Sequence, residues 1–184
     1  MKKWLLLCIL FVPGLMTQAQ TIGFREENEH VLAIETNFMI ARQKGRYDLG
    51  VALGKISYKR TGECQYILEM YMEMRRKAYT QEGSRVVFLT FSDEYVTVTQ
   101  TNGAYESINS RQPLGGLYEG FCLKASYSIQ ESDLVNLIED GIREVRIETS
   151  AGIFRYPYPS DLLGGYLKDE LALIAGKEDF TSDF

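Results

Sequence analysis

Hydrophobic and polar residues alternate most clearly in the stretch Tyr66–Lys77, which reads YILEMYMEMRRK. Side chains at alternate positions of a β-strand share one face. At about 3.6 residues per turn, the apolar residues of this stretch would instead spread around the whole circumference of a helix. The pattern therefore predicts a long strand. Its inward face would carry Tyr66, Leu68, Met70, Met72 and Met74, and its outward face Glu69, Tyr71, Glu73 and Arg75.

Strand patterns also occur on both sides of this stretch. The runs 85–91 and 95–100 are rich in β-branched and aromatic residues and flank a short polar turn, which predicts a hairpin. Pro157 has no amide donor, so the run that contains it is predicted to be an edge strand or to end there. The other runs with strand character are 31–42, 47–59, 119–129, 142–149 and 153–158.

The period changes in the last third of the chain. The segments 132–141 and 162–176 place apolar residues at helical spacing, with Leu163, Leu167, Leu171 and Ile174 on one stripe of the second. Ser132 and Gly141 are the expected caps of the first helix. The fold class predicted is α+β, a mostly antiparallel sheet of about seven to eight strands with two helices in the C-terminal third.

The first nineteen residues have the features of a secretory signal peptide. Lys2 and Lys3 precede the short apolar run Trp4–Val12, and Thr17-Gln18-Ala19 supplies small residues for cleavage. We therefore expect a signal peptide at 1–19, a flexible lead-in at 20–30, a single α+β domain at 31–176 and a tail at 177–184. The protein would be exported to the periplasm or outside the cell. The apolar run is too short for an ordinary membrane-spanning helix.

The charge balance makes nucleic acid a poor partner, because the net charge is −5 and loss of Lys2 and Lys3 makes the exported chain more acidic. Phosphate-binding glycine loops and dinucleotide fingerprints are absent from the sequence. We expect no cofactor.

Cysteine, histidine and methionine set the remaining chemistry. Cys64 and Cys122 could form a disulfide in an oxidising compartment, or remain two separate buried thiols. The single histidine, His30, lies in no catalytic motif and is expected at the surface or at a strand start. Met70, Met72 and Met74 could present three thioethers to Cu(I), but the same spacing is typical of a strand's core face. We expect no metal site.

Twelve tyrosines are the main compositional signal for binding. Tyrosine combines an apolar ring with a polar tip, which suits contact surfaces. The polar connection 101–118 is long enough to indicate a functional loop. The candidate ligand-binding residues are Tyr105 and Tyr118 near its ends, and Tyr156 and Tyr158 beside Pro157.

The function expected is that of a non-catalytic binding or structural domain of the cell envelope, whose partner is a protein, a glycan or an apolar ligand. A glycan hydrolase that uses paired carboxylates is the alternative. Its candidate acids include Asp93, Glu94 and Glu119. A Cu(I)-binding module is the third possibility.

Overall fold

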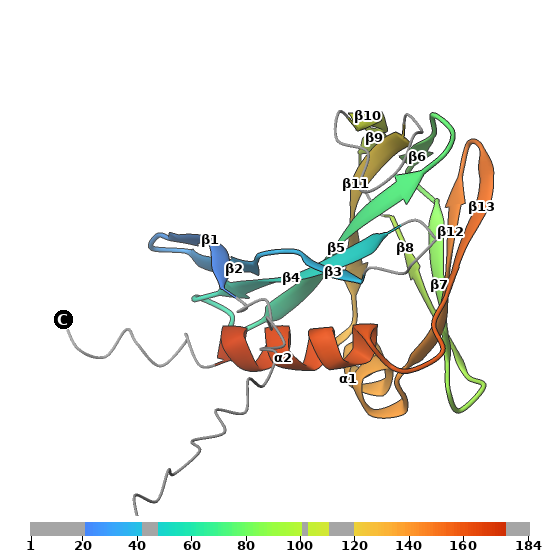
Figure 1. Ribbon diagram of the computed structural model, residues 1–184. Coiled ribbons are helices and arrows are strands. Elements are labelled where there is room, and N and C mark those ends of the chain that lie inside the picture. The colour runs from blue at the N-terminus through green and yellow to red at the C-terminus, as the bar shows by residue number, and fades with distance from the viewer. Residues whose placement is uncertain (1–20, 42–47, 101–102, 111–119, 176–184) are drawn as a thin grey trace, which may run out of the picture.

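The computed structural model describes residues 21–41, 48–100, 103–110 and 120–175 (Figure 1). The large sheet comprises β1 (Ile22–Glu27), β2 (Val31–Thr36), β3 (Met39–Ala41), β4 (Leu49–Tyr58), β5 (Cys64–Met74), β10 (Ile108–Ser110) and β11 (Gly120–Ile129). The small sheet comprises β7 (Arg85–Thr90), β8 (Tyr95–Thr99), β12 (Ile142–Thr149) and β13 (Gly152–Pro157). Strands β6 (Tyr79–Gln81) and β9 (Ala104–Glu106) form a separate pair, and the helices are α1 (Glu131–Asp140) and α2 (Leu163–Ala175).

All strand pairs described are antiparallel. The large sheet has the order β1-β2-β4-β5-β11-β10, with β3 also paired to β4, and the small sheet has the order β13-β12-β7-β8. Helix α2 lies below the large sheet, where it contacts β4 and β2, and α1 packs beside it (Figure 1). The fold is therefore α+β with mostly antiparallel strands and two helices in the C-terminal third, as the sequence predicts.

The core lies between the two sheets and the helices, and β5 supplies its longest continuous face. Tyr66 is 6% exposed, and the other four predicted inward residues of β5 are fully buried. They face Tyr127, Ala125 and Leu123 of β11 on one side and Leu53, Val51 and Leu49 of β4 on the other. The predicted strand and its inward face are confirmed.

Asp161 links the start of β12 to the start of α2. Its Oδ1 accepts hydrogen bonds from the backbone amides of Ile142, which begins β12, and Gly164, in the first turn of α2, both at 2.9 Å. A Cβ on Gly164 would lie 2.6 Å from Asp161 Oδ2 and 2.9 Å from the carbonyl oxygen of Leu137 in α1, so glycine permits this close approach. Gly165 has no such contact.

Several local predictions differ from the structure. Residues 22–27 of the expected flexible lead-in form β1, which pairs with β2. Helix α1 begins at Glu131, so Ser132 lies inside the first turn and is not its cap, whereas Gly141 does end the helix. The described ranges contain thirteen strands rather than seven to eight, because β1 and the three-residue strands β3, β6, β9 and β10 add to the predicted runs. The tail at 177–184 lies outside these ranges.

Substitution of Met70 tests the core face of β5. Met70→Ala should lower the free energy of unfolding by about 2–5 kcal/mol, because it leaves a cavity in a fully buried site. Met70→Leu keeps the volume and should change it by less than about 1.5 kcal/mol. Urea titration followed by circular dichroism measures both, with the exposed turn variant Glu63→Ala as the control. Equal stability of Met70→Ala and the wild type would contradict the assignment.

Glu170 is an acid inside the core. It lies on the buried face of α2 with Leu163, Leu167 and Ile174, and its side chain is fully buried. Neither carboxylate oxygen has a hydrogen-bond partner. Burial, assisted by the neighbouring charge of Asp169, raises the pKa of Glu170 to about 9. The folded protein therefore holds this carboxyl group in its neutral form at pH 7.

The raised pKa of Glu170 predicts a pH-dependent loss of stability. The folded state binds this proton more tightly than the unfolded state, so the group's contribution to stability is full below about pH 4.5 and falls as the pH rises to about 9. At pH 7 the loss should be on the order of 3 kcal/mol. Glu170→Gln should remove this contribution from the variant, so the difference in unfolding free energy between variant and wild type should change with pH between about 4.5 and 9.

Urea titrations at several pH values between 4 and 9 measure the effect of Glu170→Gln. The exposed helical variant Glu139→Gln serves as the control for loss of a carboxylate. Parallel stability profiles of the Glu170→Gln variant and the wild type would show that Glu170 ionises freely in the folded protein.

Candidate functional site

Two of the four candidate tyrosines belong to the core. Tyr156 and Tyr158 are 6% and 4% exposed. The Tyr156 hydroxyl donates a hydrogen bond of 2.8 Å to the backbone carbonyl of Glu73, which joins β13 to β5. Burial raises the pKa of Tyr158 above its ordinary value. These side chains therefore hold the two sheets together and present no exposed tyrosine patch.

Of the other two candidates, the structure describes only Tyr105. Tyr105 lies in β9 opposite Thr80 of β6, where it is half-buried against the core. Tyr118 lies outside the described residues. The signal for burial was present in the sequence, because Phe154, Tyr156 and Tyr158 recur at a period of two and share the inward face of β13 and its extension.

A surface hollow forms where the small sheet opens. The register of β12 with β7 runs to the pair Ile147–Val86. Further along, Ser150 binds β6 instead: its amide donates to the Tyr79 carbonyl oxygen at 3.0 Å, and its hydroxyl accepts from the Tyr79 amide at 3.1 Å. The segment between β6 and β7 turns at Gly83, whose φ of +87° favours glycine. The hollow is the space that this turn leaves beside β12.

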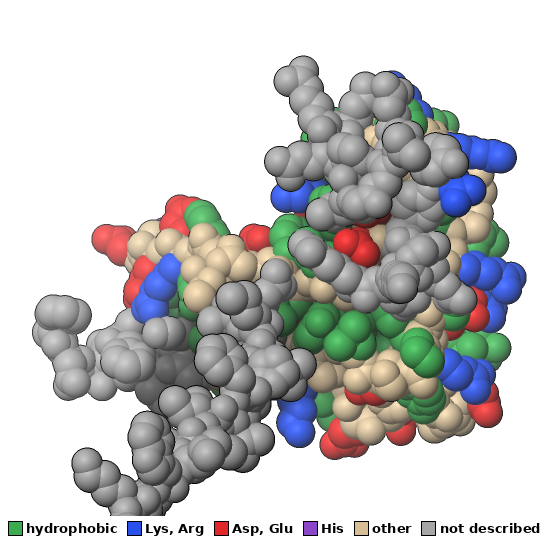
Figure 2. Space-filling view, in the orientation of Figure 1, with side chains coloured by type: hydrophobic (Ala, Val, Ile, Leu, Met, Phe, Trp, Pro, Cys, Tyr) green, Lys and Arg blue, Asp and Glu red, His purple; other side chains and the backbone are tan. Residues whose placement is uncertain are grey.

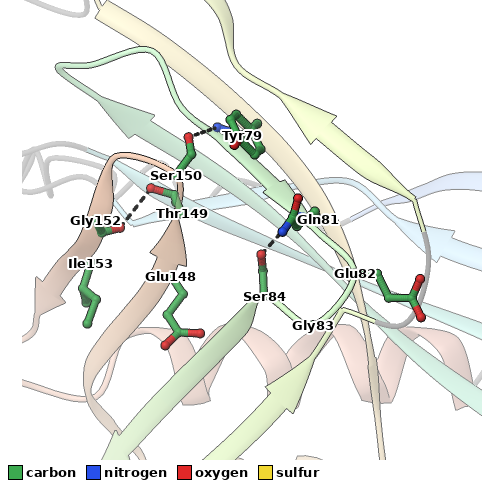
Figure 3. A pocket seen from close by; sticks show the side chains of 10 residues that line it. All are labelled: Tyr79, Gln81, Glu82, Gly83, Ser84, Glu148, Thr149, Ser150, Gly152 and Ile153. Carbon is green, nitrogen blue, oxygen red and sulfur yellow. Dashed lines mark hydrogen bonds between the residues drawn. The ribbon is translucent and has the colours of Figure 1, made fainter.

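The hollow has a volume of about 500 Å³, and its lining combines polar side chains with apolar surface (Figure 3). Its exposed apolar groups are Tyr79 and Ile153, which are 49% and 60% exposed. Ser84 is fixed by its turn, where its hydroxyl accepts a 3.0 Å hydrogen bond from the Gln81 amide. The lining consists of Tyr79, Gln81, Glu82, Gly83, Ser84, Glu148, Thr149, Ser150, Gly152 and Ile153.

The acid at the base of the hollow is held as a carboxylate. Arg85 donates two hydrogen bonds to Glu148, from Nε at 3.0 Å and from a terminal nitrogen at 2.6 Å. These bonds hold the pKa of Glu148 below its ordinary value. Glu148 is therefore suited to accept hydrogen bonds and unsuited to donate a proton near pH 7.

A cluster of aromatic and charged side chains covers the outer face of β4 in the large sheet. Phe38, between β2 and β3, meets Tyr71 of β5 edge-on across β4, with ring centroids 6.2 Å apart. Lys124 Nζ of β11 lies 4.9 Å from the centroid of the Phe38 ring. The strand beneath carries Gly50 and Ala52, which leave room for these side chains.

Glu35 and Glu69 accompany this cluster on the outer face. Burial, and then the charge of Glu69, raises the pKa of Glu35, and the charge of Lys124 opposes the rise. Glu69 accepts a hydrogen bond from Ser126 of β11. Neither acid lines the hollow. The two carboxylates influence one another electrostatically, but they are not placed in the described cavity.

The acids considered for hydrolysis are not assembled into a site. Asp93 and Glu94 are exposed in the turn between β7 and β8, where Asp93 binds Arg143. Glu119 lies outside the described residues. Among the described residues, no three His, Cys, Asp or Glu side chains are grouped for metal binding. His30 is exposed immediately before β2, as predicted.

Cys64 and Cys122 are too far apart to form a disulfide. Cys64 lies opposite Ser57 at the start of β5, whereas Cys122 lies opposite Glu73 near its other end. At about 3.3 Å per residue, the separation along β5 is roughly 30 Å. A disulfide requires Cα atoms within about 7 Å. Both cysteines are therefore free thiols, of which Cys64 is exposed and Cys122 half-buried.

The comparisons with known proteins find no match. No family model, curated protein or solved structure is significantly similar to this chain. Neither α1 nor α2 is long and apolar enough to cross a membrane. Function therefore has to be inferred from the geometry of the described residues.

The separation of Cys64 from Cys122 predicts their reactivity. Without prior reduction, a maleimide should label Cys64 rapidly in the folded protein. Cys122 should react more slowly, because it is partly covered, and at full rate only after denaturation. Mass spectrometry of the tryptic peptides identifies the labelled thiols. A peptide pair linked between Cys64 and Cys122 in the unreduced protein would contradict the register of β5.

Proposed function

We propose that this protein is a non-catalytic binding domain that holds a short neutral saccharide in the hollow beside β12. The observation that supports this proposal is a cavity of about 500 Å³ whose lining combines six polar side chains with an exposed tyrosine. That volume falls within the range of small-molecule sites, which is roughly 300–1,000 Å³. The proposal includes export, for which the signal-peptide pattern at 1–19 is the support.

The chemistry of the lining favours a saccharide over an apolar ligand. Pockets for apolar ligands have mostly hydrophobic and aromatic walls. This hollow instead presents the polar side chains of Gln81, Glu82, Ser84, Glu148, Thr149 and Ser150. Hydroxyl groups of a sugar can both donate to and accept from such groups. The Tyr79 ring adds one apolar surface at the rim.

The state of Glu148 favours binding over hydrolysis. A glycosidase needs one carboxylic acid with a raised pKa as proton donor. Glu148 has a lowered pKa, because Arg85 binds it with two hydrogen bonds. Its carboxylate can orient a sugar hydroxyl by accepting a hydrogen bond, and this is the role that we assign to it.

NMR titration of ¹⁵N-labelled protein with cellotriose and chitotriose tests the proposal. At least one of these neutral sugars should shift the amide resonances of residues 79–84 and 148–153. Tyr79→Ala should weaken that binding about two- to ten-fold, through loss of the ring contact. Tyr95→Ala is the matched control, because Tyr95 is 60% exposed in β8 but does not line the hollow.

Two outcomes of the titration would contradict the proposal. One is the absence of shifts with both sugars at millimolar concentration. The other is a set of shifts located elsewhere on the protein and unaffected by Tyr79→Ala.

A further inference from the structure

Strand β13 is a free edge of the small sheet. Among the described strands it pairs with β12 alone, and it stands at the right-hand margin of Figure 1. The register pairs Gly152 with Thr149, and beyond the strand the Tyr158 amide donates to the Arg143 carbonyl oxygen at 2.7 Å. Hydrogen-bonded and non-hydrogen-bonded pairs alternate in an antiparallel ladder. The backbone groups of Ile153 and Arg155 therefore point away from β12, toward solvent.

Arg155 is the arginine of the small sheet that has no carboxylate partner among the described residues. The other three are paired: Arg85 with Glu148, Arg143 with Asp93, and Arg146 with Glu144. Arg155 is exposed on the free-edge strand itself. Figure 2 shows basic side chains along this margin, over the small sheet. The edge thus offers both unpaired backbone groups and an unneutralised positive charge.

We propose that β13 accepts an extended peptide from a partner protein as an additional strand, with an acidic side chain of that peptide opposite Arg155. Strand addition of this kind derives affinity from main-chain hydrogen bonds and selectivity from side chains at alternate positions. Ile153, which is 60% exposed, provides an apolar contact two residues from the charge. Pro157 lacks an amide donor and ends the pairing, so the contact covers about five residues.

A second copy of the chain fits this edge less well than an acidic peptide. Symmetric antiparallel pairing would place Arg155 opposite Ile153, Ala151 or another Arg155, depending on the register. None of these arrangements supplies a carboxylate, and the last places like charges opposite each other. The proposal rests on the backbone and charge of β13 and does not depend on a saccharide occupying the hollow.

Hydrogen exchange with defined peptides tests strand addition. The probes are acetylated and amidated Thr-Val-Glu-Val-Thr and the same peptide with Lys in place of Glu. The Glu peptide at millimolar concentration should slow exchange of the Ile153 and Arg155 amides, as measured by NMR. The Lys peptide should bind roughly two- to five-fold more weakly, as expected for loss of one cross-strand charge pair.

Charge reversal separates this interaction from non-specific binding. Arg155→Glu should reverse the preference, so that the Lys peptide binds more tightly than the Glu peptide. Arg60→Glu, in the exposed turn after β4, is the matched control and should leave the preference unchanged. The proposal is overturned if neither peptide protects the two amides, or if Arg155→Glu keeps the original order. It is also overturned if sedimentation shows that the unliganded protein is a dimer and dilution to the monomer speeds exchange of the Ile153 and Arg155 amides.

Discussion

The pairing of β5 with a long strand on each side is the interaction on which the rest of the structure depends. Its register with β4 runs from Cys64 to Met72, and its register with β11 runs from Tyr66 to Met74. The inward side chains then form an uninterrupted apolar floor on which the small sheet and the helices pack. A shift of one residue in either register would turn five apolar side chains toward solvent and the acidic residues toward the core, so the alternation itself fixes the register.

Both faces of β4 are covered, and this gives the large sheet a structural role. The inner face of β4 contacts α2, and the outer face lies beneath Phe38 and its neighbours. The outer face of the small sheet carries paired charges and has the hollow at one end.

The sequence predicted those parts of the fold in which one face is buried. Strand β5, the hairpin of β7 and β8, and both helices have a clear period, because burial selects apolar residues at regular positions. Strand β1 has no such period, since all of its residues after Ile22 are exposed, and its polar sequence predicts a flexible segment instead. The three-residue strands are too short to show any period.

The candidate site was harder to predict, because local patterns do not report which segments meet. The hollow arises where the pairing of β12 with β7 ends and Ser150, in the turn after β12, bonds to Tyr79 of β6. No single stretch of sequence encodes that arrangement. For the tyrosines, composition and spacing gave conflicting signals. Composition suggested a binding surface, but the spacing of Tyr156 and Tyr158 placed them in the core. Export remains a prediction, since residues 1–20 lie outside the described ranges.

The distance between Cys64 and Cys122 has a consequence for the protein's surroundings. Because the two cysteines that the structure describes cannot be joined within one chain, packing and hydrogen bonds stabilise these sheets without a covalent link between them. Reducing and oxidising conditions therefore favour the same arrangement of strands. The described fold therefore does not depend on a disulfide between Cys64 and Cys122, whatever the redox potential of the compartment.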